Sequence, residues 1–98
     1  AIIGSNDEIA AGTLAAAREK GLKIPEQLSI AGFEDSPFSR QSWPQITTAG
    51  LPTEMMAKAA TDLLISELSP HAPAQRAPLK KVFSAELFER ASTVKLQN

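Results

Sequence analysis

The sequence predicts an α/β fold built on a parallel sheet. Three observations support this prediction: an apolar segment at residues 1–5, a helical pattern directly after it, and a second apolar segment at residues 28–33. A strand, a helix and a strand in this order form a unit whose two strands run parallel. The 98 residues are enough for one small domain, and their composition, 43% hydrophobic and 21% charged, is that of an ordinary globular chain.

Residues 1–5 are predicted to form a short buried strand. Their apolar start without Met favours a fragment of a longer chain; the alternative is a processed or artificially started domain. Ser5 and Glu8 have the spacing of a capping box, so we expect a helix over residues 8–20. Gly21 lies just beyond the last turn and is a natural left-handed stop for this helix.

The second strand is expected at residues 28–33, because Pro25 prevents the first helix from resuming. Residues 36–45 contain Pro and Trp without a regular pattern and are predicted to form a loop. A short β-branched strand follows at residues 46–49. These segments complete the first half of the chain.

A second helix is expected over residues 54–68, with Thr53 as its cap and one continuous apolar face. A Pro-rich, exposed connection follows at residues 69–78. Residues 81–89 are predicted to form the last strand. The tail after Arg90 is polar, and we expect it to fray.

The composition excludes several classes of protein. The chain has no cysteine, which rules out a disulfide scaffold, thiol chemistry and a zinc–cysteine site. The absence of cysteine leaves the redox compartment open and only weakly favours the cytosol. Ten basic and eleven acidic residues give a net charge of −1, so the domain lacks the positive field of a nucleic-acid-binding surface. The apolar runs are far shorter than the roughly 20 residues that cross a bilayer, and no signal-peptide pattern is present.

Polar side chains follow the first two predicted strands: Asn6 and Asp7 after one, Glu34 and Asp35 after the other. Ligands of open parallel sheets bind outside the carboxyl ends of the strands. An amide beside a carboxylate suits the adjacent hydroxyls of a sugar or nucleoside, or a cationic amine. The same residues also have simpler interpretations, because Asn6 or Asp7 can cap the helix and the acidic pair can belong to an ordinary loop. Trp43 can pack under its loop, stack on a ligand ring or lie in a subunit interface.

No pattern in the chain indicates catalysis. His71 is the only histidine and falls in the Pro-rich connection without patterned neighbours, which argues against a Ser-His-Asp arrangement. Gly4 and Gly12 lack the spacing of a phosphate-binding loop. We therefore predict no enzyme, no catalytic residue, no metal site and no cofactor.

Four blocks, in order and at the right intervals, resemble the LacI/GalR family of bacterial transcriptional regulators. Residues 3–12 resemble that family's strand, Asn-Asp pair and helix start. Residues 21–35 resemble its Gly-x-x-Ile/Val-Pro segment and the Gly-Phe-Asp-Asp that ends the block. Residues 44–48 resemble its Pro-Pro-Leu-Thr-Thr run, and residues 52–54 fit the helix start that follows. The resemblance covers nearly the whole chain.

This resemblance implies the C-terminal part of an effector-binding domain, a fragment of the periplasmic-binding-protein-like (type I) fold. In that fold two α/β subdomains flank a ligand cleft. Residues 1–50 and about 80–92 would belong to the C-terminal subdomain, and the helix at about 52–69 to the N-terminal one. The DNA-binding helix-turn-helix of the family is absent from this chain.

The resemblance also assigns ligand contacts residue by residue. Asn6 matches a ligand-binding asparagine. Glu34 stands where the family usually has an aspartate, and Leu51 where a pocket glutamine is common. Both departures favour a smaller or partly apolar effector over a simple hexose. Trp43 is a fourth candidate for contact with the ligand, and Asp7 matches a position with a capping and packing role.

Two further positions, Ala11 and Ser42, match dimer contacts of the family. The surface of the first predicted helix is made of unusually small residues, which let either a sheet or a second subunit approach closely. Its small residues are Ala10, Ala11, Gly12, Ala15, Ala16 and Ala17.

The implied function is that of a cytoplasmic, homodimeric regulator without membrane contact. A small sugar-like effector would control its binding to operator DNA allosterically, through the DNA-binding domain missing from this chain. The alternative is a periplasmic sugar-binding protein of an ABC transporter, and a second alternative is an enzyme or phospho-acceptor domain using Glu34 or Asp35. The blocks at residues 21–25 and 44–48 favour the regulator over the transport protein.

Overall fold

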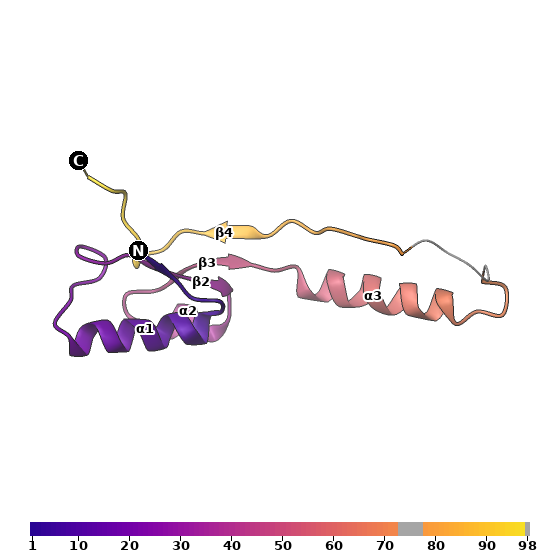
Figure 1. Cartoon of the computed structure of the whole chain (residues 1–98), viewed down its shortest axis with the longest axis horizontal. Coiled ribbons are helices and arrows are strands. Elements are labelled where there is room, and N and C mark those ends of the chain that lie inside the picture. Colours follow the sequence, from indigo (N-terminus) through magenta and orange to yellow (C-terminus); the bar gives the residue numbers. More distant parts are fainter. Residues whose placement is uncertain (73–77, 98) are drawn as a thin grey trace. The chain divides into compact units, whose positions relative to one another are not determined.

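The computed structural model describes residues 1–72 and 78–97 (Figure 1). Its contacts divide the chain into two compact units, unit 1 with Ala1–Leu51 and Ala85–Asn98, and unit 2 with Pro52–Ser84. The fold is mixed α/β, as predicted. The elements in chain order are β1 (Ile2–Ile3), α1 (Asp7–Glu19), β2 (Ile30–Glu34), α2 (Pro37–Gln41), β3 (Thr47–Gly50), α3 (Thr53–Glu67) and β4 (Glu86–Phe88).

Unit 1 contains one four-stranded sheet in the order β1-β2-β3-β4. Strands β1, β2 and β3 run parallel, and Ala31 of β2 lies opposite both Ile3 and Thr47. Strand β4 returns antiparallel to β3, with Phe88 opposite Thr48. The predicted strand–helix–strand unit with its parallel pair is confirmed. The last strand is shorter than the predicted segment 81–89.

The core of unit 1 lies between α1 and one face of the sheet. Small residues on the buried stripe of α1 let the helix backbone approach the strands closely, and they pack against two isoleucines of the sheet side. The buried residues are Ala10, Leu14, Ala17, Ile30 and Ile46. The expectation that the first strand is buried is wrong: β1 pairs only with β2 among the described residues, and the Ile3 side chain is 79% exposed.

Helix α1 begins and ends through local signals. Asn6 is its N-cap, and the side-chain Oδ1 accepts a hydrogen bond from Ile9 N at 2.8 Å. The capping box expected from Ser5 is therefore wrong by one residue. At the other end Gly21 has a φ of +75°, and Leu22 N donates to Ala17 O at 3.0 Å. The predicted glycine stop is confirmed.

Two segments of unit 1 are more ordered than predicted. The loop expected at residues 36–45 contains α2, which Pro37 opens at the first helical position, where its missing N–H costs nothing. The tail after Arg90 does not fray at Ser92, which is fully buried. Ser92 N donates to Gln45 O at 3.0 Å, and Ser92 O accepts from Ile30 N at 2.9 Å. Ser92 thus supplies backbone partners just before β3 and at the start of β2.

Unit 2 consists of α3 and the segments that follow it. The N-cap of α3 is Pro52 without a side-chain cap, so the expectation that Thr53 caps this helix is wrong. No residue of α3 is buried by the described parts of the chain. Its predicted apolar face is present but uncovered, with exposed side chains at Met55, Met56, Leu63, Leu64, Ile65 and Leu68. Residues 73–77 of the predicted Pro-rich connection lie outside the described residues.

Within the part of the chain that the structure describes, no helix has the length and apolar character needed to span a membrane.

Candidate ligand-binding edge

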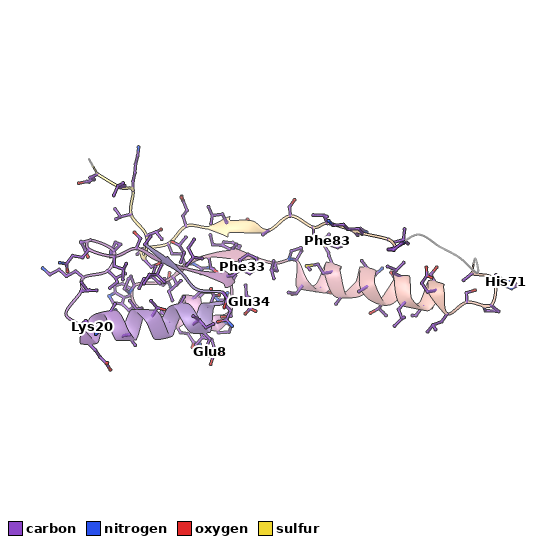
Figure 2. The ribbon with its side chains drawn as sticks, in the orientation of Figure 1. Glu8, Lys20, Phe33, Glu34, His71 and Phe83 are labelled. Carbon is purple, nitrogen blue, oxygen red and sulfur yellow. The ribbon has the colours of Figure 1, made fainter. Side chains whose placement is uncertain are left out.

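Three of the predicted ligand contacts lie at the carboxyl ends of adjacent parallel strands. Asn6 follows β1, Glu34 is the last residue of β2, and Leu51 follows β3. In the register of the sheet, Glu34 lies opposite Gly50, next to Leu51 in the chain. Figure 2 shows Glu34 at the same end of unit 1 as Glu8 in the first turn of α1, with Lys20 at the other end. The topology therefore brings these residues to one edge of the sheet.

Trp43 does not follow a strand. It lies in the connection between α2 and β3, which leads into the amino end of β3. Its side chain is 79% exposed, which excludes the interpretation that the ring packs beneath the loop. The structure leaves the other two interpretations of Trp43, a ligand contact or a subunit contact, as predictions.

The two residues after β1 have different roles. The Asn6 oxygen caps α1, while its amide nitrogen carries two further N–H donors. Asp7 is fully buried. Its Oδ2 accepts a hydrogen bond from Ser36 N, and its Oδ1 accepts one from the Thr48 hydroxyl, both at 2.6 Å. Asp7 therefore ties α1 to the loop after β2 and to β3, and both its oxygens are engaged in structure.

Gly32 makes room for the buried carboxylate of Asp7. A Cβ atom at position 32 would lie 2.2 Å from Asp7 Oδ1, far inside van der Waals contact. Only a glycine at this point of β2 lets the carboxylate cross the sheet face to reach Thr48. The Gly-Phe segment of the sequence thus has a packing reason in this chain.

The loop after β2 has an uncommon backbone. Glu34 has a φ of +110° and Asp35 a φ of +59°, two consecutive non-glycine residues in the positive region. Each such residue costs about 1–3 kcal/mol unless its surroundings hold it. Backbone donors of the loop are held: Asp35 N donates to Thr48 Oγ1 at 3.3 Å, and Ser36 N to Asp7. The exposed side chain of Glu34 projects from this fixed backbone.

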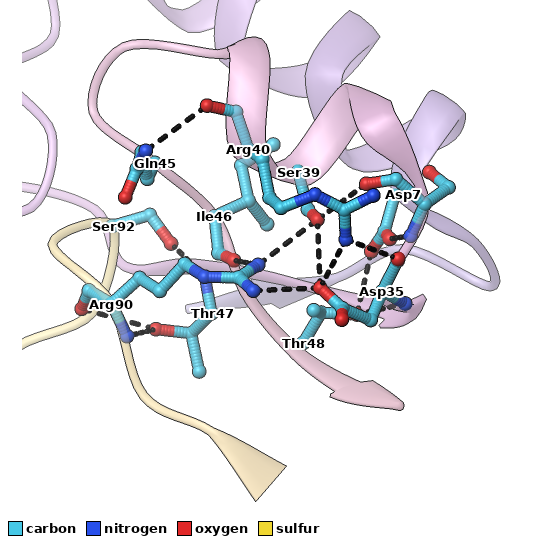
Figure 3. A network of polar contacts seen from close by, with 11 residues as sticks. Asp7, Asp35, Ser39, Arg40, Gln45, Ile46, Thr47, Thr48, Arg90 and Ser92 are labelled. Carbon is cyan, nitrogen blue, oxygen red and sulfur yellow. Dashed lines mark hydrogen bonds and ion pairs between the residues drawn. The ribbon is translucent and has the colours of Figure 1, made fainter. Parts of the chain in front are cut away.

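Two arginines meet the side chain of Asp35, as Figure 3 shows. Arg90 Nη2 lies 2.6 Å and Arg40 Nη1 3.0 Å from Asp35 Oδ1. Burial of the Asp35 carboxyl raises its pKa, but the hydrogen bond and charge of Arg90, with those of Arg40, outweigh burial. The pKa of Asp35 therefore lies below its usual value of 3.8.

These contacts show which polar groups at the edge are occupied within the protein and which are free to meet a ligand. The carboxylates of Asp7 and Asp35 accept hydrogen bonds within the protein, whereas the Glu34 carboxylate is exposed. Among residues 1–72 and 78–97, no cluster of three or more acidic or histidine side chains is placed to hold a metal ion. The chemistry available here is hydrogen bonding: Glu34 accepts and the amide of Asn6 donates.

A groove of about 780 Å³ lies elsewhere, lined by residues 25–29 and 93–97 with Ala1. Residues 25–29 precede β2, so this groove is at the amino ends of the strands. None of the four predicted ligand contacts lines it. Binding sites of open parallel sheets lie at the carboxyl ends, and we therefore assign the candidate site to the edge with Glu34.

The two predicted dimer contacts are both half-buried within the chain. Ala11 packs against the core, and the Ser42 hydroxyl donates to Phe38 O at the end of α2. The part of α1 that faces outward is small, with Gly12, Ala15 and Ala16 exposed. This surface stays a predicted subunit contact.

Sequence reasoning missed the role of Arg90, because it placed this residue at the start of a fraying tail. Arg90 and its partner Asp35 are 55 residues apart. No local pattern connects them, and the partnership follows only from the antiparallel return of β4. A lone arginine two residues before a serine is not a recognisable signal without that topology.

An open α/β sheet with three parallel strands and polar side chains at their carboxyl ends is the arrangement at which α/β proteins bind ligands. Residues 1–93 match the family model described as "Periplasmic binding protein-like domain". The chain belongs to this family, in the form found in LacI/GalR-type regulators.

Similar proteins include the HTH-type transcriptional regulator GalS of Salmonella typhimurium, 45% identical over 65 residues, which are 66% of this chain and 19% of GalS. The regulator MalR of Streptomyces coelicolor is 37% identical over 93 residues, 95% of this chain and 26% of MalR. A periplasmic binding protein/LacI transcriptional regulator from Alkaliphilus metalliredigens, solved with D-xylulofuranose, superposes with a TM-score of 0.78 at 27% identity, covering 96% of this chain and 34% of that one. The chain thus spans between a fifth and a third of the length of these proteins.

Proposed function

We propose that this chain is the effector-sensing and dimerisation part of a LacI/GalR-type transcriptional regulator. The observation that carries the proposal is the edge formed by Asn6, Glu34 and Leu51 at the ends of three adjacent strands. In this arrangement the exposed Glu34 carboxylate accepts hydrogen bonds from two hydroxyls of a sugar-like effector. The Asn6 amide donates to a neighbouring oxygen, and Leu51 lines the apolar side of the site. Trp43 precedes the amino end of β3, away from this edge, and is kept as a candidate subunit contact.

In the proposal the two units belong to two subdomains of the effector-binding domain. Residues 1–50 and about 80–92 form part of the C-terminal subdomain, and the helix at about 52–69 belongs to the N-terminal one. The grouping of contacts, with boundaries after Leu51 and Ser84, supports this division. So does the uncovered apolar face of α3, which suits a helix that packs against another part of a larger protein.

The proposed mechanism is allosteric and involves no reaction of the ligand. Effector binding changes the closure of the two subdomains and, through a homodimer contact near Ala11 and Ser42, the geometry of the DNA-binding parts. Such coupling is typically about 1–3 kcal/mol, or roughly 5- to 150-fold in operator affinity. The effector must bind one of the two conformations more tightly, since otherwise no population shifts. We place this regulator in the cytoplasm, where the operator is.

The similar proteins support the regulator over the alternatives. GalS and MalR are transcriptional regulators by name, and neither is a transport protein or an enzyme. The sugar ligand of the Alkaliphilus structure supports a polyhydroxyl effector. An ABC-transporter sugar-binding protein is not favoured by these relatives.

The test uses the full-length regulator and an operator fragment selected from random DNA. Operator affinity is measured by fluorescence anisotropy without and with D-galactose, maltose, cellobiose or D-xylulose. Because Glu34 and Leu51 favour a smaller effector, we expect D-xylulose, the smallest of these sugars, to change the affinity of the wild type at least fivefold. Glu34→Ala abolishes this response, Glu34→Gln weakens it, and both keep the fold, because the side chain is exposed.

The matched control is Glu26→Gln, an exposed acid before β2 at the opposite end of the sheet. It should leave the response unchanged. A Glu34→Ala regulator that still responds like the wild type would show that Glu34 does not hold the effector. A wild type that binds the selected operator with no response to any of the four sugars would contradict the sugar-like effector.

A further inference from the structure

Arg90 connects the segment after β4 to the loop that carries Glu34. Its backbone N donates to Thr47 Oγ1 at 2.8 Å, which fixes the main chain beside β3. The guanidinium then makes three contacts: Nη2 donates to Asp35 Oδ1 at 2.6 Å, and Nη1 donates to Ser39 Oγ at 2.9 Å and to Ile46 O at 3.0 Å. A single side chain thus joins α2, the start of β3 and the loop after β2 (Figure 3).

The loop that Arg90 holds is the one with the uncommon backbone. Asp35 (φ +59°) follows Glu34 (φ +110°) directly, so the contact on Asp35 acts one residue from the proposed ligand contact. Without this contact, the positive φ angles of Glu34 and Asp35 are less well stabilised by their surroundings. A change in φ at Glu34 or Asp35 redirects the Glu34 side chain, because the backbone sets the direction of its Cα–Cβ bond.

Arg90 is better suited to this role than Arg40. The side chains of Arg90 and Asp35 are 15% and 22% exposed, whereas that of Arg40 is 48% exposed. Arg40 Nη1 also donates to the Asp35 backbone oxygen at 2.7 Å, but solvent screens this more exposed pair more strongly. The Arg90 guanidinium is also shielded on one side by Phe88 of β4, whose ring centre lies 5.4 Å from Arg90 Cζ.

We propose that Arg90 is a positioning residue of the effector site: through Asp35 it holds the loop after β2 so that the Glu34 carboxylate is presented to the ligand. This proposal rests on the proposed ligand role of Glu34. Arg90 itself makes no proposed contact with the ligand. The substitution Arg90→Lys would keep the positive charge. A lysine lacks the planar, forked guanidinium and so could not donate hydrogen bonds to Asp35, Ser39 and Ile46 at the same time.

The experiment compares Arg90→Lys and Arg90→Gln with the wild type in the full-length regulator. The matched control is Arg18→Lys, the same chemical change at an exposed position of α1. Hydrogen exchange of the amides of Asp35 and Ser36 reports whether the loop is held, and the amides of α1 report whether the protein is folded. Affinity for D-galactose, maltose, cellobiose and D-xylulose is measured by calorimetry.

In both Arg90 variants we expect at least tenfold faster exchange at Asp35 and Ser36, with α1 unchanged. The affinity for the sugar that the wild type binds should fall about tenfold in Arg90→Gln and less in Arg90→Lys, and should stay unchanged in Arg18→Lys. In a Glu34→Gln background, which weakens binding without abolishing it, Arg90→Lys should lower the affinity less than it does in the wild type, because Arg90 acts through the side chain at position 34. A purely structural Arg90 would weaken binding equally in both backgrounds.

Unchanged exchange of the loop in both variants would overturn the proposal, whatever the sugars do. A loosened loop with unchanged sugar affinity would overturn it as well. If the wild type binds none of the four sugars, the proposed effector function fails, whereas the exchange of the loop still decides whether Arg90 holds Glu34 in place.

Discussion

The buried Oδ2 of Asp7 accepts a hydrogen bond from the backbone N–H of Ser36 at 2.6 Å, so the first turn of α1 is joined directly to the loop after β2. The other oxygen of the same carboxylate binds the Thr48 hydroxyl. One side chain thus connects the first turn of α1, the loop after β2 and strand β3. The edge that carries Asn6, Glu34 and Leu51 is therefore held by a residue that points away from solvent.

Replacing Asp7 should destabilise the protein strongly. Asp7→Ala leaves Ser36 N and Thr48 Oγ1 without their acceptor, and each unsatisfied buried group costs about 1–3 kcal/mol. We expect a loss of about 3 kcal/mol in the free energy of unfolding, and a smaller loss for Asp7→Asn, which keeps one acceptor oxygen. Urea denaturation of the full-length regulator measures this. Glu8→Gln, the exposed neighbour, is the control and should change stability little, and an equal loss in both variants would contradict the role of Asp7.

Adding one methyl group at Gly32 should disturb the same contact. The new Cβ would stand 2.2 Å from Asp7 Oδ1, so the carboxylate must move away from Thr48. We expect Gly32→Ala to cost about 3 kcal/mol, the upper end for overpacking. Gly12→Ala is the control, because its Cβ would meet no atom within 4 Å and Ala favours the helix. The midpoint temperature of thermal unfolding should therefore rise for Gly12→Ala and fall for Gly32→Ala. Similar shifts of this temperature in both variants would refute the explanation.

The stability of the protein should depend on pH through Asp35. The pKa of Asp35 is lower in the folded protein than its ordinary value of 3.8, since burial is outweighed by Arg90 and Arg40. A lowered pKa contributes stability above the ordinary value, and this contribution is lost as pH falls through the folded pKa. Between pH 5 and pH 3 the wild type should lose more stability than Asp35→Asn, which has no carboxyl to protonate there. Parallel pH curves for the two proteins would show that the ion pairs contribute nothing.

Ser92 should matter for the sheet although it lies outside every strand. Its hydroxyl accepts a hydrogen bond from Thr47 N at 2.9 Å and donates to Ile30 O. Ser92→Ala removes both contacts in a fully buried place, and we expect a loss of about 2 kcal/mol. Ser5→Ala is the exposed control. If chemical denaturation finds the two variants equally stable, Ser92 is not a structural link between β2 and β3.

Much of the fold follows from local patterns. The apolar stripe of α1 and the apolar segments on either side of it predict the parallel pair, because periodicity and element order are properties of neighbouring residues. Gly21 is predictable for the same reason. The five-residue helix α2 is too short to show a period, and the cap of α1 falls on Asn6 rather than Ser5 because several capping residues stand side by side.

The position of the candidate site could be predicted from the sequence, but the residues that hold it in place could not. The rule that ligands bind at the carboxyl ends of parallel strands points to Asn6 and Glu34 from the sequence. The groups that hold this edge are remote: Arg90 is 55 residues from Asp35, and Thr48 is 41 residues from Asp7. The first pair depends on how β4 returns beside β3, and the second on how α1 packs against the parallel strands; no local pattern contains either.

The position of Ser92 has a consequence for how the protein is made. Ile30 and Ser92, which bond to each other in the finished sheet, are separated by 62 residues. At a synthesis rate of about 5–20 residues per second, the start of β2 waits on the order of several seconds for this partner. Until then Ile30 and Thr47 lack the hydrogen bonds that Ser92 makes to them. Unit 1 is therefore completed only after unit 2 has been synthesised, although most of its residues precede unit 2 in the chain.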